Sequence, residues 1–259
     1  MIAKMINPAS AANEVHRRLG WSNPDDFTLD EMANALGIVI KEVAIGGSEG
    51  RILIDGDEAI MSIDSSITYA PKRNFVIAHE IGHFILHKNI APLFSETDHT
   101  LSEWYQNGPQ EQQANQFAAE LLMPAMIFKE KLAKRKLNIK LVQEMSSYFK
   151  TSLTATFLRY ATCGDFPLMV IFIEGGLVKW KSVSDDFPFK FLQINSEVPP
   201  LTVAGDLFNK NQYEDEPEKI DAIEWFPENT QLHRDPDYQL WEQCYRVSPT
   251  GFISCLWTD

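Results

Sequence analysis

The chain has 259 residues, 44% hydrophobic and 23% charged, and a formal net charge of −13 at pH 7. That length and hydrophobic content suffice for one large or two modest domains with packed cores. No stretch approaches 18 uninterrupted apolar residues, and no basic region followed by an apolar core opens the chain, so we expect a cytoplasmic protein without membrane contact. The three cysteines lack C-x-x-C spacing, which predicts neither disulfides nor a cysteine zinc site.

The charge is unevenly distributed along the chain. Residues 1–160 carry 16 basic and 19 acidic side chains, net −3, whereas residues 161–259 carry 7 and 17, net −10. Such an acidic surface repels nucleic-acid phosphate and attracts a basic protein. We therefore expect a protein partner and no direct nucleic-acid binding. The alternative is that these acids merely keep a loop solvated.

The first elements in the chain are two short predicted helices, over residues 11–19 and 29–36, the second ended by Gly37. Three β-favouring runs follow, at residues 38–40, 51–54 and 59–63. Gly46-Gly47 and Asp55-Gly56 separate these runs, which predicts a small sheet with hairpin turns.

Residues 79–83 read His-Glu-Ile-Gly-His within a largely apolar run after Pro71, which predicts a buried helix. Four residues on a helix turn through roughly 400°, so His79 and His83 share one face and can bind one metal ion. Glu80 then lies beside the ion. With this spacing a carboxylate takes a proton from a water whose pKa the cation has lowered, which predicts peptide or amide hydrolysis. The alternative is a core helix with two ordinary buried histidines.

A third metal ligand has to come from outside this motif. His87 lies about 12 Å along the helix from His79, too far to share an ion with bonds near 2 Å, and is expected to be a polar residue near the helix C-terminus. Residues 111–124 read as a second helix that ends at a proline. If it packs antiparallel on the first, Glu111 completes a His-His-Glu site and Asn115 orients a ligand histidine. Glu111 as a first-turn acid favoured by the helix dipole is an equal alternative on spacing alone.

The long connection over residues 89–110, with His99, Trp104 and Tyr105, has a length typical of functional or disordered segments. Beyond Pro124, helices are predicted over residues 128–136, 139–149 and 153–160. The last two have a spacing like helix-turn-helix, and a basic cluster lies between residues 129 and 140. The cluster could contact nucleic acid, but a solvated basic face is the simpler interpretation.

From Phe166 onward the pattern changes to β. Residues 168–173 and 177–180 flank Gly175-Gly176 and predict a hairpin. Large aromatic side chains continue to the end of the chain, which indicates that this region packs a core of its own. They are Trp225, Tyr238, Trp241, Tyr245, Phe252 and Trp257.

The motif of residues 79–87, with Arg73 and Phe75 before it and the E-x-x-A-N-x-F-A-A-E-L-L-M-P string of residues 111–124 after it, resembles an ImmA/IrrE-type zinc metallopeptidase. The similarity extends over roughly residues 10–175 and is sharpest over 71–124. The resemblance implies that Glu111 is the third ligand. It also implies a regulatory protease of bacteria, phages or mobile elements that cleaves a helix-turn-helix repressor and so releases its genes. In that family an edge strand can hold extended substrate. The family pattern also places the helices that follow Pro124 beside the catalytic core, which implies a structural or substrate-docking element.

These features predict an α+β protein. A zincin-like metallopeptidase core over residues 1–127, with a small mixed sheet, the HExxH helix and a second ligand helix, precedes a helix-turn-helix-like segment (128–162) and an acidic, β-rich C-terminal domain (163–259). The expected function is a zinc-dependent endopeptidase of gluzincin-like His-His-Glu type, with Mn²⁺ a possible alternative metal. The competing function is a non-catalytic metal-containing module that senses a signal or sequesters a regulatory protein. The sequence leaves the oligomeric state open.

Overall fold

The computed structural model describes residues 7–89, 93–96, 108–164, 166–211 and 216–258. The chain divides into two compact units. The N-terminal unit extends to residue 131 and also holds residues 143–152, whereas the C-terminal unit holds residues 132–142 and everything from residue 153 on. Both units mix helices with a sheet, so the predicted α+β class is confirmed.

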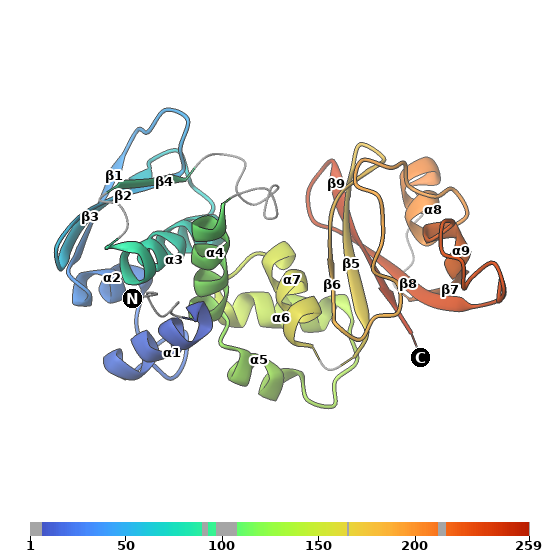
Figure 1. Ribbon diagram of the computed structural model, residues 1–259, viewed down its shortest axis with the longest axis horizontal. Helices are drawn as coiled ribbons and strands as arrows, with labels where there is room; N and C mark the ends of the chain where they lie inside the picture. Colours follow the sequence, from blue (N-terminus) through green and yellow to red (C-terminus); the bar gives the residue numbers. More distant parts are fainter. Residues whose placement is uncertain (1–6, 90–92, 97–107, 165, 212–215, 259) are drawn as a thin grey trace, which may run out of the picture. The chain divides into compact units, whose positions relative to one another are not determined.

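Two capped helices open the N-terminal unit (Figure 1). In α1 (Pro8–Leu19) the Asn7 side chain accepts the backbone N–H of Ser10, and Gly20 ends the helix at φ +69°. In α2 (Leu29–Ala35) Thr28 and Glu31 satisfy each other's backbone N–H groups in a capping box. Both predicted helices are present, and α1 begins three residues before its predicted start.

A four-stranded mixed sheet follows, in the order β1-β3-β2-β4. The strands β2 (Gly50–Asp55) and β3 (Glu58–Asp64) form an antiparallel hairpin, whereas β1 (Ile38–Val43) pairs with β3 in parallel. The predicted hairpin turn at Gly46-Gly47 is therefore wrong. β1 and β2 lie on opposite sides of β3, so the segment with Gly46-Gly47 joins two strands that do not pair with each other. The fourth strand, β4 (Leu93–Glu96), pairs antiparallel with β2.

Side chains alternate between the two faces of this sheet. The inner face is buried, with Ile52, Ile54, Met61 and Ile63 no more than 6% exposed, and it packs against α3 (Ala70–His87). Helix α4 (Pro109–Leu122) packs on α3 and α1. The sheet thus provides one wall for α3, and α4 provides another. Residues 97–107, which include His99, Trp104 and Tyr105, lie outside the described residues.

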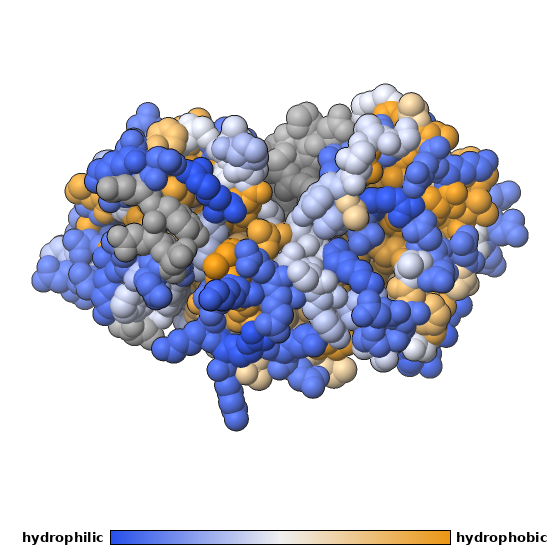
Figure 2. Space-filling view, turned by 180° about the vertical axis from the view of Figure 1, so that it is seen from behind, coloured by the Kyte–Doolittle hydropathy of each residue, from blue (hydrophilic) through white to orange (hydrophobic). Residues whose placement is uncertain are grey.

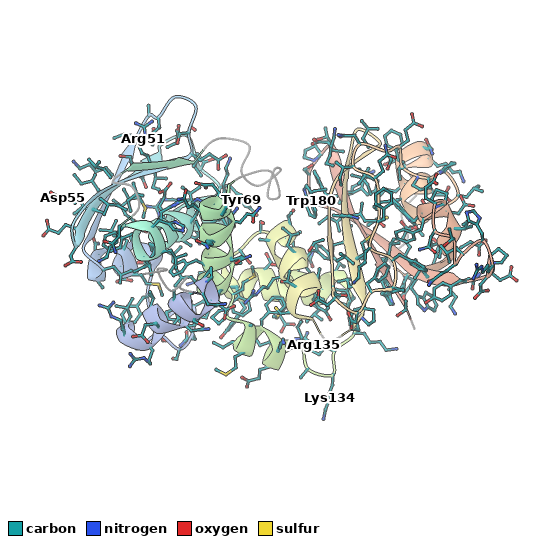
Figure 3. All side chains as sticks on the ribbon, in the orientation of Figure 1. Arg51, Asp55, Tyr69, Lys134, Arg135 and Trp180 are labelled. Carbon is teal, nitrogen blue, oxygen red and sulfur yellow. The ribbon has the colours of Figure 1, made fainter. Side chains whose placement is uncertain are left out.

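Three helices follow α4. They are α5 (Ala125–Leu132), α6 (Ile139–Phe149) and α7 (Leu153–Cys163). Helix α6 has its predicted bounds, whereas α5 lies earlier than predicted because the backbone leaves the helical region at Lys134, where φ is +63°. Lys134 and Arg135, part of the basic cluster, are exposed in the turn that follows α5 (Figure 3). The division of the chain at residues 127 and 162 stays a prediction.

The C-terminal unit is built on a five-stranded antiparallel sheet in the order β6-β5-β9-β8-β7. The predicted hairpin is confirmed as β5 (Leu168–Glu174) and β6 (Leu177–Val183). The other strands are β7 (Glu218–Asp221), β8 (Gln239–Arg246) and β9 (Gly251–Trp257), and the remaining helices are α8 (Val203–Lys210) and α9 (Ala222–Trp225).

Both faces of this second sheet are covered by apolar side chains. Trp225 and Phe226 join strand residues such as Ile171 in one core, on the side of α8 and α9 (Figure 1). On α7, Phe157 packs on Tyr245 with ring centroids 5.0 Å apart. The aromatic C-terminal region therefore packs a core of its own, as predicted. No helix in the described ranges has the length and apolar character needed to cross a membrane.

Candidate metal centre

Helix α3 is anchored at its first turn before it enters the core. The guanidinium of Arg73 donates two hydrogen bonds to the Asp30 carboxylate, at 2.9 and 2.8 Å, and its Nε donates to Glu42 at 3.0 Å. These contacts join α3 to α2 and β1. Beyond this turn the helix is buried almost without interruption to His87. The HExxH motif therefore lies in the interior of the N-terminal unit.

Two glycines let the neighbouring elements approach this motif closely. A Cβ atom at Gly82 would lie 3.2 Å from the Cα of Ala114, so the backbones of α3 and α4 are close at that point. A Cβ at Gly50 on β2 would lie 2.6 Å from Val76 Cγ1 and 2.8 Å from the Glu80 carboxylate. A larger residue at either position would clash with these neighbours, so the observed packing of α3 between the sheet and α4 requires glycine at both.

The three predicted ligands lie close together, two on α3 and one on α4. Glu111 Oε2 lies 3.1 Å from His79 Nε2, and Glu111 Oε1 lies 3.3 Å from His83 Nε2. The two Nε2 atoms are 3.0 Å apart. Tetrahedral zinc with bonds near 2 Å holds its ligand atoms roughly 3.3 Å from one another. The donor set and its spacing therefore fit a zinc ion, and these residues can hold a metal.

Asn115 sets the proton position on His79. Its Oδ1 lies 2.8 Å from His79 Nδ1, and both residues are fully buried. An amide oxygen only accepts hydrogen bonds, so the His79 Nδ1–H donates and the neutral ring keeps a lone pair on Nε2. That lone pair is on the ring nitrogen that lies 3.1 Å from Glu111 Oε2, where it can bind a metal ion together with the carboxylate. The position of Asn115 agrees with the predicted orienting contact.

His87 and Gln113 make the corresponding arrangement for His83. Gln113 Oε1 lies 2.9 Å from His87 Nε2, and His87 Nδ1 lies 3.1 Å from His83 Nδ1. The amide oxygen accepts from Nε2–H, so a neutral His87 accepts at Nδ1 and the His83 Nδ1–H donates to it. His83 thereby also keeps its Nε2 lone pair. The sequence pattern placed His87 near the helix end but missed this role, for which its i,i+4 spacing from His83 was the available signal.

Residues 33–159 match the family model for the IrrE N-terminal-like domain, a peptidase family. This part of the chain belongs to that family. A solved structure titled "Mycobacterium tuberculosis transcriptional regulator" is similar over 97% of this chain and 76% of its own, with a TM-score of 0.60 and 14% sequence identity, which shows a shared fold. No protein with a curated description matches the chain.

The protonation states in this IrrE-like domain suit a cation. Burial is the main cause that lowers the pKa of His83, to about 4, and nearby histidines lower it further. Burial alone would raise the pKa of Glu111, but its contacts with His79 and His83 outweigh burial and lower it. Near neutral pH the Glu111 carboxylate is therefore ionised and the His83 ring is neutral. These are the states in which the two side chains bind a metal ion.

Glu80 completes the IrrE-like site. Its side chain is fully buried on α3, one residue from His79 and next to Gly50 of β2. Glu111 by contrast retains about a quarter of its side-chain exposure, so the ligand cluster has an approach from solvent. The arrangement therefore combines three groups that could hold a metal ion, one of them reachable by water, with a carboxylate outside that set.

Proposed function

We propose that the IrrE-like domain is a zinc-dependent endopeptidase with His79, His83 and Glu111 as metal ligands and Glu80 as general base. The convergence of two imidazole lone pairs and a carboxylate beside a second, fully buried carboxylate supports this proposal. The donor set and its near-tetrahedral spacing favour zinc over manganese, which prefers octahedral oxygen ligands.

A bound zinc ion would supply the Lewis acidity that polarises the scissile carbonyl and lowers the pKa of the attacking water. Glu80 takes a proton from that water while the water oxygen forms a bond to the carbonyl carbon. The same carboxyl then donates the proton to the leaving amine when the C–N bond breaks. Asn115 and the His87–Gln113 pair hold the ligand rings in the tautomer and orientation that binding needs.

For the substrate we propose a helix-turn-helix repressor, cleaved in the cytoplasm so that its genes are released. Family membership supports this class, and an extended segment of such a repressor can add to the edge of the sheet at β4, the strand that follows α3. The acidic region over residues 161–259, with net charge −10, favours encounter with a basic DNA-binding protein.

The substitution Glu80→Gln tests the mechanism. It should reduce cleavage of the repressor encoded beside this gene by about 100- to 10,000-fold, while metal content stays the same. Glu130→Gln, an exposed glutamate on α5, is the matched control and should cleave normally. Cleavage by Glu80→Gln at the wild-type rate would exclude Glu80 as the base.

Metal stoichiometry should be measured first, by mass spectrometry on protein purified without chelator or affinity metal. The proposal expects about one zinc ion per chain. Zinc binding without cleavage of any such regulator would favour the non-catalytic binding module. No metal, even after zinc is offered, would contradict the metal centre itself.

A further inference from the structure

The outer face of the N-terminal sheet combines exposed apolar and charged side chains. It is the face opposite α3. Val39, Leu53 and Ile60 are 53%, 52% and 41% exposed although all three are large aliphatic residues. Hydrophobic side chains lie next to hydrophilic ones on the surface of the N-terminal unit in Figure 2. A sheet face of this kind is typical of a contact surface.

The strand register arranges these side chains in three rows across β1, β3 and β2. The middle row is apolar, because Ile60 pairs with both Val39 and Leu53. A basic row lies two residues away along the strands, where Ser62 pairs with Lys41 and Arg51. An acidic row lies two residues away in the opposite direction, where Asp55 pairs with Glu58. Adjacent rows are about 7 Å apart.

The charged side chains of both outer rows are exposed and available to a partner. Lys41, Arg51, Asp55 and Glu58 all point away from the core. Among the described residues, none of the four takes part in a side-chain ion pair or hydrogen bond within its own chain. Arg51 and Asp55 lie toward opposite ends of β2, on either side of Leu53 (Figure 3).

We propose that this face binds the same face of a second copy of the chain, with the two-fold axis running along the apolar row. Rotation about that axis turns one face onto the other and exchanges the two ends of every strand. The apolar rows then meet, and the basic row of each copy faces the acidic row of its partner. Arg51 faces Asp55 across β2, and Lys41 reaches Glu58 one strand away. An axis along the strands would instead place like charges together, so charge complementarity selects the first axis.

The size of this face predicts a weak dimer. Three strands about 5 Å apart, with about five residues each, cover an area on the order of 15 by 15 Å. The interface therefore falls below the roughly 1,200 Å² that separates transient from standard complexes. Association is expected at micromolar to sub-millimolar protein concentration and should weaken as salt rises. Because the face lies opposite α3, this dimer does not depend on the proposed peptidase function.

Sedimentation velocity on the full chain, with charge reversals on β2, tests the proposal. The wild-type chain should dimerise at low salt. In Arg51→Asp two acidic side chains face each other, at position 51 of one copy and Asp55 of the other. In Asp55→Arg two basic side chains face each other at the same positions. Each variant alone should therefore show at least about a tenfold weaker self-association. An equimolar mixture of the two variants should associate again, because each introduced charge faces its opposite.

Arg234→Asp provides the matched control, since Arg234 is an exposed arginine of the C-terminal unit. It should dimerise like the wild type. Circular dichroism of each variant checks that the fold is intact, and all substituted side chains are exposed. A wild-type chain that stays monomeric at sub-millimolar concentration overturns the proposal, as does a mixture of the two variants that fails to associate. Loss of metal or of cleavage bears on the peptidase proposal alone.

Discussion

Each unit of the molecule holds a glutamate with a shifted pKa, and the two pKa values are shifted in opposite directions. In the N-terminal unit, contacts with His79 and His83 outweigh burial and lower the pKa of Glu111. In the C-terminal unit, complete burial raises the pKa of Glu242 on β8 to about 7, although hydrogen bonds oppose that shift. Two glutamates that look alike in the sequence thus lose their protons over different pH ranges.

The partners of Glu242 explain its different character. Its carboxyl accepts from Ser254 Oγ at 2.6 Å, from the backbone N–H groups of Val203 and Ala204 at 2.8 and 3.3 Å, and from Trp225 Nε1 at 3.3 Å. All of these donors are neutral and belong to the surrounding core, so Glu242 joins α8, α9 and β9. Glu111 instead faces the ring nitrogens of His79 and His83 and is about a quarter exposed. Burial among neutral donors thus gives a structural carboxyl, whereas convergence with two imidazole rings gives a candidate metal site.

Removal of Glu111 should have the largest effect on zinc binding. Glu111→Ala deletes the anionic ligand and leaves two histidines, so zinc affinity should fall by more than the roughly 10- to 100-fold that loss of an outer partner costs. Competition with a chromophoric chelator measures the change. Gln110→Ala, on the exposed side of the same turn, should bind zinc normally. Unaltered metal content in Glu111→Ala would remove Glu111 from the site.

The pH dependence of stability tests the other carboxyl. The unfolded Glu242 side chain loses its proton near pH 4.5, whereas the folded one keeps it to about pH 7. Between these values only the folded state holds the proton, so this group's contribution to stability is full below pH 4.5 and is lost as pH rises toward 7, by on the order of 3 kcal/mol.

Chemical unfolding followed by tryptophan fluorescence at pH 5, 6, 7 and 8 measures this loss. Glu242→Gln cannot titrate and should flatten the profile. Glu218→Gln, an exposed glutamate paired with Glu242 on the neighbouring strand, should leave it unchanged. Equal pH profiles for the wild type and Glu242→Gln would show that the buried carboxyl has an ordinary pKa.

Loss of the contact between His87 and Gln113 should have a smaller effect on zinc binding than loss of Glu111. Gln113→Ala frees the tautomer of His87 and thus the ring orientation of His83, so zinc affinity should fall about 10- to 100-fold. Asn115→Ala should have a similar effect through His79. Gln116→Ala, exposed on the same helix, should have none. Chelator competition separates these cases, and normal affinity in Gln113→Ala would mean that His87 does not position His83.

The local elements and half of the candidate site could be predicted from the amino-acid sequence. Helix and strand types follow from short-range patterns, such as the cap at Thr28 and the β5–β6 hairpin at two glycines. The i,i+4 spacing of His79 and His83 places them on one helix face, whatever surrounds that helix. These features depend on residues a few positions apart, which a sequence pattern records directly.

The contacts between distant segments could not be predicted from the amino-acid sequence. The parallel pairing of β1 with β3, the convergence of Glu111 with the histidines, and the His87–Gln113 contact all join separate elements. So does the burial of Glu242 beneath α8 and α9. Local periodicity says which face of an element is apolar but not which element covers it. Packing settles that choice, and with it which acidic side chain meets imidazoles and which meets neutral donors.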